Sequence, residues 1–366
     1  MADNTDIAFT ELVNQGVAKK LAEFVALVQK KFSPRNDSAQ AELGALPFLN
    51  LHQLEQLCQE QPTNYIVEGF LPADDVHVAV GDSGLGKTAW AYQLGLCVAS
   101  GKPFLDAPVQ QGRVLYFDME NGREEILQVG RSLCSYLGIE AFPENFLIRS
   151  DEAQGMSLAD AVAQFRPSLV IIDTLRPFRP DAEKTNDEMG KFQQELKAVA
   201  RKEHCAVLLL HHIRKAGELG VPALEDTDII EWLQQASGAR ALINQTNTRI
   251  AFDRSRKVAH ADSSLVMKFF VKMKGESGPI YIERVCDPQG DPIGYRRIVG
   301  LELLGNADQQ AAFTKLPEQF TFKEARQAYG RSDDPTNKWL KKCEAAGLIE
   351  KLEKRGHYQR LRAVQA

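Results

Sequence analysis

The 366-residue sequence has little that points to a membrane-bound or secreted protein. No apolar run approaches the roughly 18 residues that a membrane-spanning helix needs, so we expect no membrane partner. The first residues are acidic and lack the apolar core of a signal peptide. The six cysteines are scattered and include no C-x-x-C pair, which argues against disulfides and a zinc site. We therefore expect a cytoplasmic protein whose cysteines are reduced and lie mainly in its core.

Positive charge is scarce except near the C-terminus. The net charge is −5, but from Asp308 onward 12 lysines and arginines stand against 8 acidic residues. The rest of the chain carries 32 basic residues against 41 acidic ones. A basic segment on an acidic body indicates a nucleic-acid partner for that segment.

One glycine-rich turn carries the clearest chemical signal. It joins an apolar strand at 76–80 to a buried helix at 89–100 and follows the pattern G-x-x-x-x-G-K-[ST]. Its glycines let backbone N–H groups turn inward around a phosphate. Lys87 is expected to reach the β- and γ-phosphates, and the Thr88 hydroxyl to bind Mg²⁺. The predicted nucleotide-binding residues are Gly81, Asp82, Ser83, Gly84, Leu85, Gly86, Lys87 and Thr88.

Alternating strands and helices follow this turn. Continuous apolar runs without alternation are typical of parallel strands that are covered on both faces. The pattern predicts an α/β fold with a doubly wound, mostly parallel sheet. Residues 241–244 and 248–252 are expected to close it, and three antiparallel strands to follow. The expected parallel strands are 112–117, 145–149, 167–172 and 205–210, and the helices are 124–137, 157–165 and 186–203.

Polar residues end three of these strands. Asp173 follows the most apolar strand, which is the position from which a carboxylate holds Mg²⁺ through water. Glu120 is the candidate general base for the attacking water, with Asp118 as its competitor. His212 is placed to respond to the γ-phosphate. Two alternatives stay open: His211 faces the core, or both histidines are structural.

The order of these motifs resembles the RecA-like ATPase superfamily. It is most similar to the AAA_25 group, which includes hexameric plasmid replicative helicases of the RepA type, over residues 62–255. The resemblance implies ATP and Mg²⁺ as cofactors, Glu120 as the residue that activates water, and a homo-oligomer, most simply a hexamer. It also implies an arginine that reaches the next subunit's ATP site. Arg249 is assigned that role, with Arg240 and Arg254 as alternatives.

Two loops would face the channel of such a ring and contact single-stranded DNA. The first follows Asp173 and contains Arg176, and the second begins at Arg214 and Lys215. The second loop is acidic overall, which disfavours tight DNA tracking because phosphate contacts dominate nucleic-acid affinity.

The two ends of the chain predict further structured regions. Residues 1–61 form an N-terminal helical region, with a stripe of apolar residues over 10–32 and a short helix near 49–60. These helices either pack on their own core or form an arm that docks on a neighbouring subunit. Residues 62–304 are the ATPase domain.

Residues 305–366 resemble a winged helix that binds DNA or docks a protein. Three expected helices precede a hairpin with a basic tip. Trp339, Leu340 and Leu348 are assigned to the core. The residues expected to contact duplex DNA are Asn337, Lys338, Lys341, Lys342, Lys354 and Arg355.

We therefore expect an ATP-hydrolysing oligomeric motor that acts on DNA in the replication of a plasmid, phage or mobile element. Two alternatives remain open. One is an ATPase switch for loading, recombination or defence without unwinding. The other is a DNA-binding regulator whose assembly is controlled by ATP.

Overall fold

The computed structural model describes residues 49–60, 62–149, 156–213, 222–234, 240–255, 264–272, 274–289, 292–304 and 306–361. The chain divides into two compact units between Thr63 and Asn64. The helix expected over 10–32 lies outside the described residues. Helix α3 (Leu51–Glu60) is the described helix of the first unit and has no buried residue.

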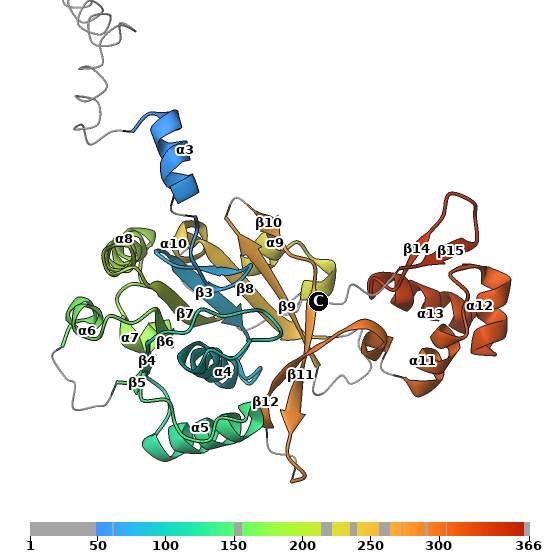
Figure 1. Cartoon of the computed structure of the whole chain (residues 1–366), viewed down its shortest axis with the longest axis horizontal. Coiled ribbons are helices and arrows are strands. Elements are labelled where there is room, and N and C mark those ends of the chain that lie inside the picture. The colour runs from blue at the N-terminus through green and yellow to red at the C-terminus, as the bar shows by residue number, and fades with distance from the viewer. Residues whose placement is uncertain are drawn as a thin grey trace, which may run out of the picture. The chain divides into compact units, whose positions relative to one another are not determined.

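The second unit is organised around a ten-stranded mixed sheet (Figure 1). Five central and edge strands run parallel, and their register is continuous from one strand to the next. The expected doubly wound α/β arrangement is therefore confirmed. These parallel strands are β3 (Val76–Gly81), β7 (Ala206–His212), β6 (Leu169–Asp173), β4 (Val114–Asp118) and β5 (Phe146–Ile148).

The other edge of the sheet is antiparallel. Strand β8 (Thr248–Arg254) pairs in parallel with β3 and in antiparallel with β9 (Ser264–Val271). Beyond β9 the order continues to β11 (Ile280–Cys286) and β12 (Pro292–Ile298), which confirms the three expected antiparallel strands. Residues 241–244 do not belong to the sheet. They lie in helix α10 (Arg240–Gln245), because Leu242 and Ile243 share one buried helical face.

Helices cover both faces of the sheet (Figure 1). Alternate residues of each central strand enter opposite apolar cores, as the two-residue period of a strand requires. In β6, for example, Ile171 faces the core beneath α4 and α5, whereas Ile172 faces the core beneath α8. The covering helices are α4 (Lys87–Ser100), α5 (Arg123–Leu137), α6 (Leu158–Phe165), α7 (Leu175–Phe178), α8 (Asn186–Glu203), α9 (Ile229–Leu233) and α10.

Local signals explain where several of these helices begin and end. Thr185 accepts a hydrogen bond from the Glu188 amide at the start of α8. Gly101 and Gly138 take left-handed φ values of 72° and 63° at the ends of α4 and α5, a conformation that glycine adopts without steric cost. None of the described helices is long and apolar enough to cross a membrane.

Short elements complete the unit. A two-stranded ribbon precedes β3, and β10 extends the edge of β9. Four of the six cysteines are buried, but Cys58 and Cys286 are exposed, so the expectation of core cysteines is wrong for these two. The short elements are β1 (Tyr65–Val67), β2 (Leu71–Pro72), β10 (Gly275–Glu276), η2 (Leu224–Asp226) and η3 (Gly300–Leu304).

The C-terminal residues form three helices and a three-stranded antiparallel sheet. Their apolar core contains Trp339, Leu340 and Leu348, as expected from the sequence. In this sheet β15 lies between the other two strands. The elements are α11 (Ala307–Thr314), β13 (Gln319–Thr321), α12 (Phe322–Tyr329), α13 (Asp333–Ala345), β14 (Ile349–Lys351) and β15 (His357–Arg360).

Candidate nucleotide-binding and hydrolysis site

The strand register gathers the predicted residues at one edge of the parallel sheet. Gly81 at the end of β3 is opposite His212 at the end of β7. Asp118 at the end of β4 is opposite Asp173 at the end of β6. Ligands of open α/β sheets bind at this carboxyl edge of the strands.

The glycine-rich turn lies between β3 and α4. Gly84 and Gly86 have φ values of 77° and 83°, a left-handed conformation that few other residues adopt without strain. Gly86 is also the N-cap of α4 and provides no side chain to satisfy the first amides of the helix. Those amides and the positive end of the helix dipole form a site suited to an anion.

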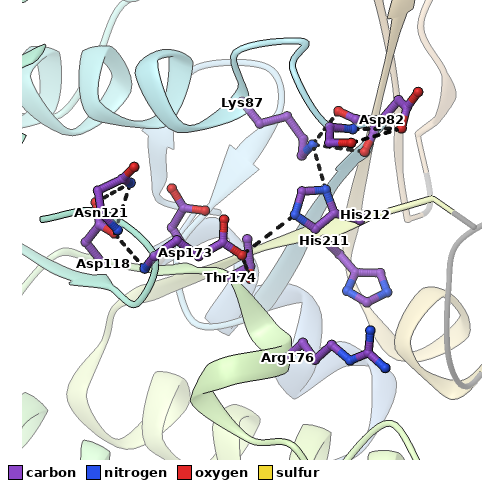
Figure 2. A network of polar contacts seen from close by, with 12 residues as sticks. Asp82, Lys87, Asp118, Asn121, Asp173, Thr174, Arg176, His211 and His212 are labelled. Carbon is purple, nitrogen blue, oxygen red and sulfur yellow. Dashed lines mark hydrogen bonds and ion pairs between the residues drawn. The ribbon is translucent and has the colours of Figure 1, made fainter. Parts of the chain in front are cut away.

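Lys87 lies at the first position of α4 and is buried. Its Nζ donates hydrogen bonds to the carbonyl oxygens of Gly81, at 2.9 Å, and Asp82, at 2.7 Å. It also lies 3.3 Å from Nδ1 of His212 (Figure 2). Burial lowers the pKa of Lys87 to about 8, although Asp173 and Asp82 oppose that shift. The ammonium is therefore held over the turn by carbonyl groups, and none of the described carboxylates forms an ion pair with it.

Asp173 is buried at the end of β6 and lies near Thr88. The Tyr116 hydroxyl donates to Asp173 Oδ2 over 2.8 Å. Burial raises the pKa of Asp173 to about 6, and the neighbouring hydroxyls of Thr88 and Tyr116 limit the increase. A carboxylate and a hydroxyl are hard oxygen donors, and Mg²⁺ is usually bound by one or two protein groups together with substrate phosphates and water. The adjacent Thr88 and Asp173 therefore fit a magnesium ion.

A tight turn after β4 separates the two candidate bases. Asp118 Oδ1 accepts hydrogen bonds from the amides of Glu120, at 3.1 Å, and Asn121, at 2.9 Å (Figure 2). Asp118 Oδ2 accepts one from the Tyr92 hydroxyl at 2.9 Å. The Asp118 carboxylate is thus committed to shaping the turn. Glu120 instead projects from it, and its Oε1 accepts a hydrogen bond of 2.7 Å from Thr174.

The two histidines at the end of β7 have different surroundings. His212 is half-buried, and its Nε2 lies 3.9 Å from Glu120 Oε1. Burial and the nearby Lys87 lower its pKa. His211 is buried, and its Nδ1 lies 3.6 Å from Glu183, whose other carboxylate oxygen lies 3.7 Å from Arg176. His212 therefore lies between the lysine and the glutamate, whereas His211 faces the loop that follows β6.

Residues 42–218 match the family model of the AAA domain, AAA_25. The match supports a P-loop ATPase family. It covers the glycine-rich turn together with Glu120, Asp173 and His212, and it ends before Arg249.

The arginines expected to reach the ATP site of the next subunit lie apart from the residues around the glycine-rich turn of their own chain. Arg249 lies opposite Val78 near the start of β8, and its Nη2 donates to the Asn244 carbonyl over 3.2 Å. Its guanidinium also lies over the Phe270 ring, 5.1 Å from the centroid. Arg240 and Arg254 are both exposed. Which of the three reaches another subunit stays a prediction.

The residues assigned to DNA have mixed positions. Arg176 is exposed, and Arg214 and Lys215 lie outside the described residues. Lys342 is half-buried and its ammonium donates to the Leu304 carbonyl, so it is tied to the protein itself. Exposed residues on or near α13 and at the turn between β14 and β15 are Asn337, Lys338, Lys341, Lys354 and Arg355.

Sequence reasoning missed several residues of the site. Thr174 follows Asp173 directly, so its position beside Glu120 could have been anticipated from the neighbouring strand ends. Tyr116 and Tyr92 are buried, and their rings stack with 4.1 Å between centroids. Nothing in the pattern distinguishes a core tyrosine from one whose hydroxyl reaches a carboxylate.

Proposed function

We propose that this P-loop ATPase hydrolyses ATP as an oligomeric motor that acts on DNA, in the manner of a plasmid- or phage-type replicative helicase. The observation that carries the hydrolytic part is the position of Glu120. Its carboxylate is held by Thr174 and lies beside His212, which contacts Lys87 in turn. A general base is thereby placed next to the residues that would hold the terminal phosphate.

Different residues of the chain have different roles in hydrolysis. The amides of the glycine-rich turn and Lys87 bind the β- and γ-phosphates. Glu120 accepts a proton from the attacking water. General-base catalysis requires the carboxylate to lie within hydrogen-bond reach of that water. Thr174 fixes the orientation of Glu120 through the 2.7 Å hydrogen bond. Magnesium, held by Thr88 and Asp173, would neutralise the charge that develops on the phosphate oxygens.

His212 would report the state of the phosphate. It lies between Lys87 and Glu120, so a movement of either group on phosphate binding changes its environment. The neighbouring His211 contacts Glu183, and Glu183 contacts Arg176 in the loop after β6. These contacts offer a route from the nucleotide to a loop assigned to DNA.

Two acidic residues of the segment after β7 have structural roles, although hydrogen bonds from neutral donors do not cancel the negative charge that disfavours DNA there. Glu225 is buried and its Oε1 accepts a hydrogen bond of 2.5 Å from Ser255. Asp228 caps α9 by accepting from the Ile230 and Glu231 amides. Two of the acidic groups therefore have structural partners within the protein.

The C-terminal helices and sheet support a second DNA contact. The order of three helices with strands β13, β14 and β15 resembles that of a winged helix, and the exposed Lys338 and Lys341 lie on α13. In winged helices the recognition helix enters the major groove and the wing contacts the backbone. We propose that α13 and the turn at Lys354 perform these roles on duplex DNA.

Assembly into a ring would complete the catalytic site. The family resemblance supports a hexamer in which Arg249 of one subunit reaches the phosphate bound by the next. An arginine supplied in trans is worth about 10³–10⁵ in rate, which would make hydrolysis depend on assembly.

The test is ATP turnover and particle mass of the full-length protein with and without single-stranded DNA. The proposal predicts turnover that single-stranded DNA stimulates, a ring-sized particle, and strand displacement at low salt. Turnover and assembly without DNA stimulation or strand displacement would instead favour the alternative of an ATPase switch. Nucleotide binding and DNA binding without turnover would favour an ATP-controlled regulator.

A further inference from the structure

The antiparallel strands β11 and β12 reach back to the glycine-rich turn of the same chain. The Tyr295 hydroxyl, on β12, donates a hydrogen bond of 3.0 Å to the Gly86 carbonyl. The guanidinium of Arg284, on β11, donates a hydrogen bond of 3.4 Å to the Gly84 carbonyl. A Cβ atom at Gly86 would collide with that hydroxyl. Two donors separated from the turn by about 200 residues therefore cover its outer side.

A buried glutamine fixes this approach. Gln93 of α4 is almost fully buried, and its Nε2 donates to the Tyr295 carbonyl over 2.8 Å. Its Oε1 accepts from the Tyr295 amide over 2.7 Å. The Tyr136 hydroxyl donates a second hydrogen bond to the same carbonyl at 3.2 Å. The backbone of Tyr295 is thus tied to the helix that begins at the phosphate-binding turn.

Arg284 has the character of a positioning cation. No ion pair involving it is found among the described residues, although Arg296 on the neighbouring strand pairs with two glutamates. An arginine without a carboxylate partner retains its charge for other groups nearby. Here the guanidinium lies at the turn that would hold a polyphosphate.

The geometry points to Tyr295 and Arg284 as positioning residues that prepare the turn for phosphate. We define them as the carbonyl clamp. The Gly84 carbonyl belongs to the same peptide unit as the Leu85 N–H, and the Gly86 carbonyl to the same unit as the Lys87 N–H. A hydrogen bond to a peptide oxygen polarises its N–H into a stronger donor. The clamp therefore both fixes the shape of the turn and strengthens two amides that face the phosphate.

This inference rests on the nucleotide binding in the proposed function and adds two residues that act through the turn. Because they act on amides that hold the β-phosphate, they should affect ADP and ATP alike. They do not touch the base Glu120, so the chemical step should be preserved. The clamp should consequently change the dissociation constant and leave kcat nearly unchanged.

The experiment measures calorimetric binding of Mg·ADP and Mg·ATPγS by the full-length protein, together with steady-state ATP turnover. We expect Arg284→Ala and Tyr295→Phe each to weaken both nucleotides by about three- to tenfold, the range of a typical hydrogen bond. Because Arg284 and Tyr295 are cross-strand neighbours on β11 and β12, the double variant should lose less than the product of the single losses. Arg284→Lys should recover part of the affinity, and kcat should stay within about twofold of wild type.

Matched controls lie on the same two strands. Arg297→Ala removes an arginine from β12, where it pairs with Ile282 of β11 on the ladder. Tyr281→Phe removes the hydroxyl of a β11 tyrosine. The ring of Tyr281 packs in the core on the other face of the sheet. Both controls should bind nucleotide as the wild type does. Thermal unfolding of each variant separates loss of fold from loss of affinity.

Several results would overturn the clamp. Unchanged affinity in Arg284→Ala and Tyr295→Phe, or an equal loss in the controls, would remove its basis. A loss confined to Mg·ATPγS would mean that Arg284 touches the γ-phosphate directly. Should Tyr295→Phe fail to fold, the clamp is tested by the nucleotide affinities of Arg284→Ala and Arg284→Lys alone. Failure of the wild-type protein to bind either nucleotide would instead refute the proposed function.

Discussion

The Thr174 hydroxyl donates a 2.7 Å hydrogen bond to Glu120 Oε1 and so joins the residues that follow two neighbouring parallel strands. Thr174 comes directly after Asp173 at the end of β6, and Glu120 lies two residues beyond the end of β4. The carboxylate proposed to activate water is therefore coupled to the strand that carries the metal-binding carboxylate. A shift of either strand end would move both groups together.

Glu120→Gln should abolish turnover while leaving nucleotide binding intact. Loss of a general base typically lowers kcat by about 10²–10⁴-fold. Thr174→Val should lower kcat by a smaller factor, about tenfold, because it removes only the orienting hydrogen bond. Steady-state turnover and Mg·ATPγS binding measure the two effects.

Glu124→Gln is the matched control for this prediction, since Glu124 is an exposed acid in the first turn of α5. It should retain full activity. Asp118→Asn should instead lower the melting temperature, because Asp118 organises the turn through several hydrogen bonds. Full turnover in Glu120→Gln would identify a different base.

The sequence is a good guide to this fold wherever one local pattern decides the structure. The unbroken apolar runs predict β6 and β7, and the glycine-lysine pattern predicts the turn before α4. Residues 241–244 form a helix and no part of the sheet, and the prediction fails there because a short apolar segment fits a strand and a buried helix equally well. The clamp at Tyr295 and the partner of Gln93 depend on contacts across about 200 residues, which no local pattern encodes.

The pH dependence of turnover should show an acid limb near pH 6. Burial raises the pKa of Asp173 to about 6, and the group must be charged to hold magnesium. Activity that depends on the carboxylate is therefore present above this pH and is lost as the pH falls through it. Because the pKa of Asp173 is higher in the folded protein than in the unfolded chain, the free energy of unfolding should decrease as the pH rises from about 4 to about 6. Above pH 6 the cost of burying the charged carboxylate is fully present.

Tyr116→Phe tests this assignment. It removes the hydrogen bond that favours the carboxylate, so the pKa of Asp173 should increase further. The acid limb should then move upward by about one pH unit, given about 1 kcal/mol for the bond. Tyr92→Phe serves as control, because its hydroxyl donates to Asp118. A limb that stays in place in Tyr116→Phe would assign it to another group.

Mixing inactive variants identifies the trans arginine. Arg249→Ala and Glu120→Gln should each be inactive alone, since one lacks the arginine and the other the base. Mixed oligomers should recover turnover, because some interfaces combine an intact Glu120 site with an intact arginine. The same mixing with Arg240→Ala and Arg254→Ala ranks the alternatives. Absence of rescue for Arg249→Ala would indicate that this residue acts within its own subunit or in folding.

Duplex binding by the C-terminal segment is tested through its salt dependence. Lys338→Ala with Lys341→Ala should weaken duplex DNA binding and reduce the slope of log K against log salt by about 1.8, or 0.9 for each lost phosphate contact. Lys315→Ala with Lys323→Ala is a control of equal charge, because both side chains are exposed outside α13. Equal losses in the two double variants would indicate a general charge effect without a defined DNA-binding face.

The most direct test of the central claim is magnesium-dependent ATP turnover in wild type, Lys87→Ala and Lys191→Ala. Lys87 is buried at the glycine-rich turn, whereas Lys191 is a lysine of α8 paired with Asp187. The account predicts turnover in the wild type, none in Lys87→Ala, and wild-type turnover in Lys191→Ala. Turnover that survives in Lys87→Ala would contradict the assignment of hydrolysis to this site.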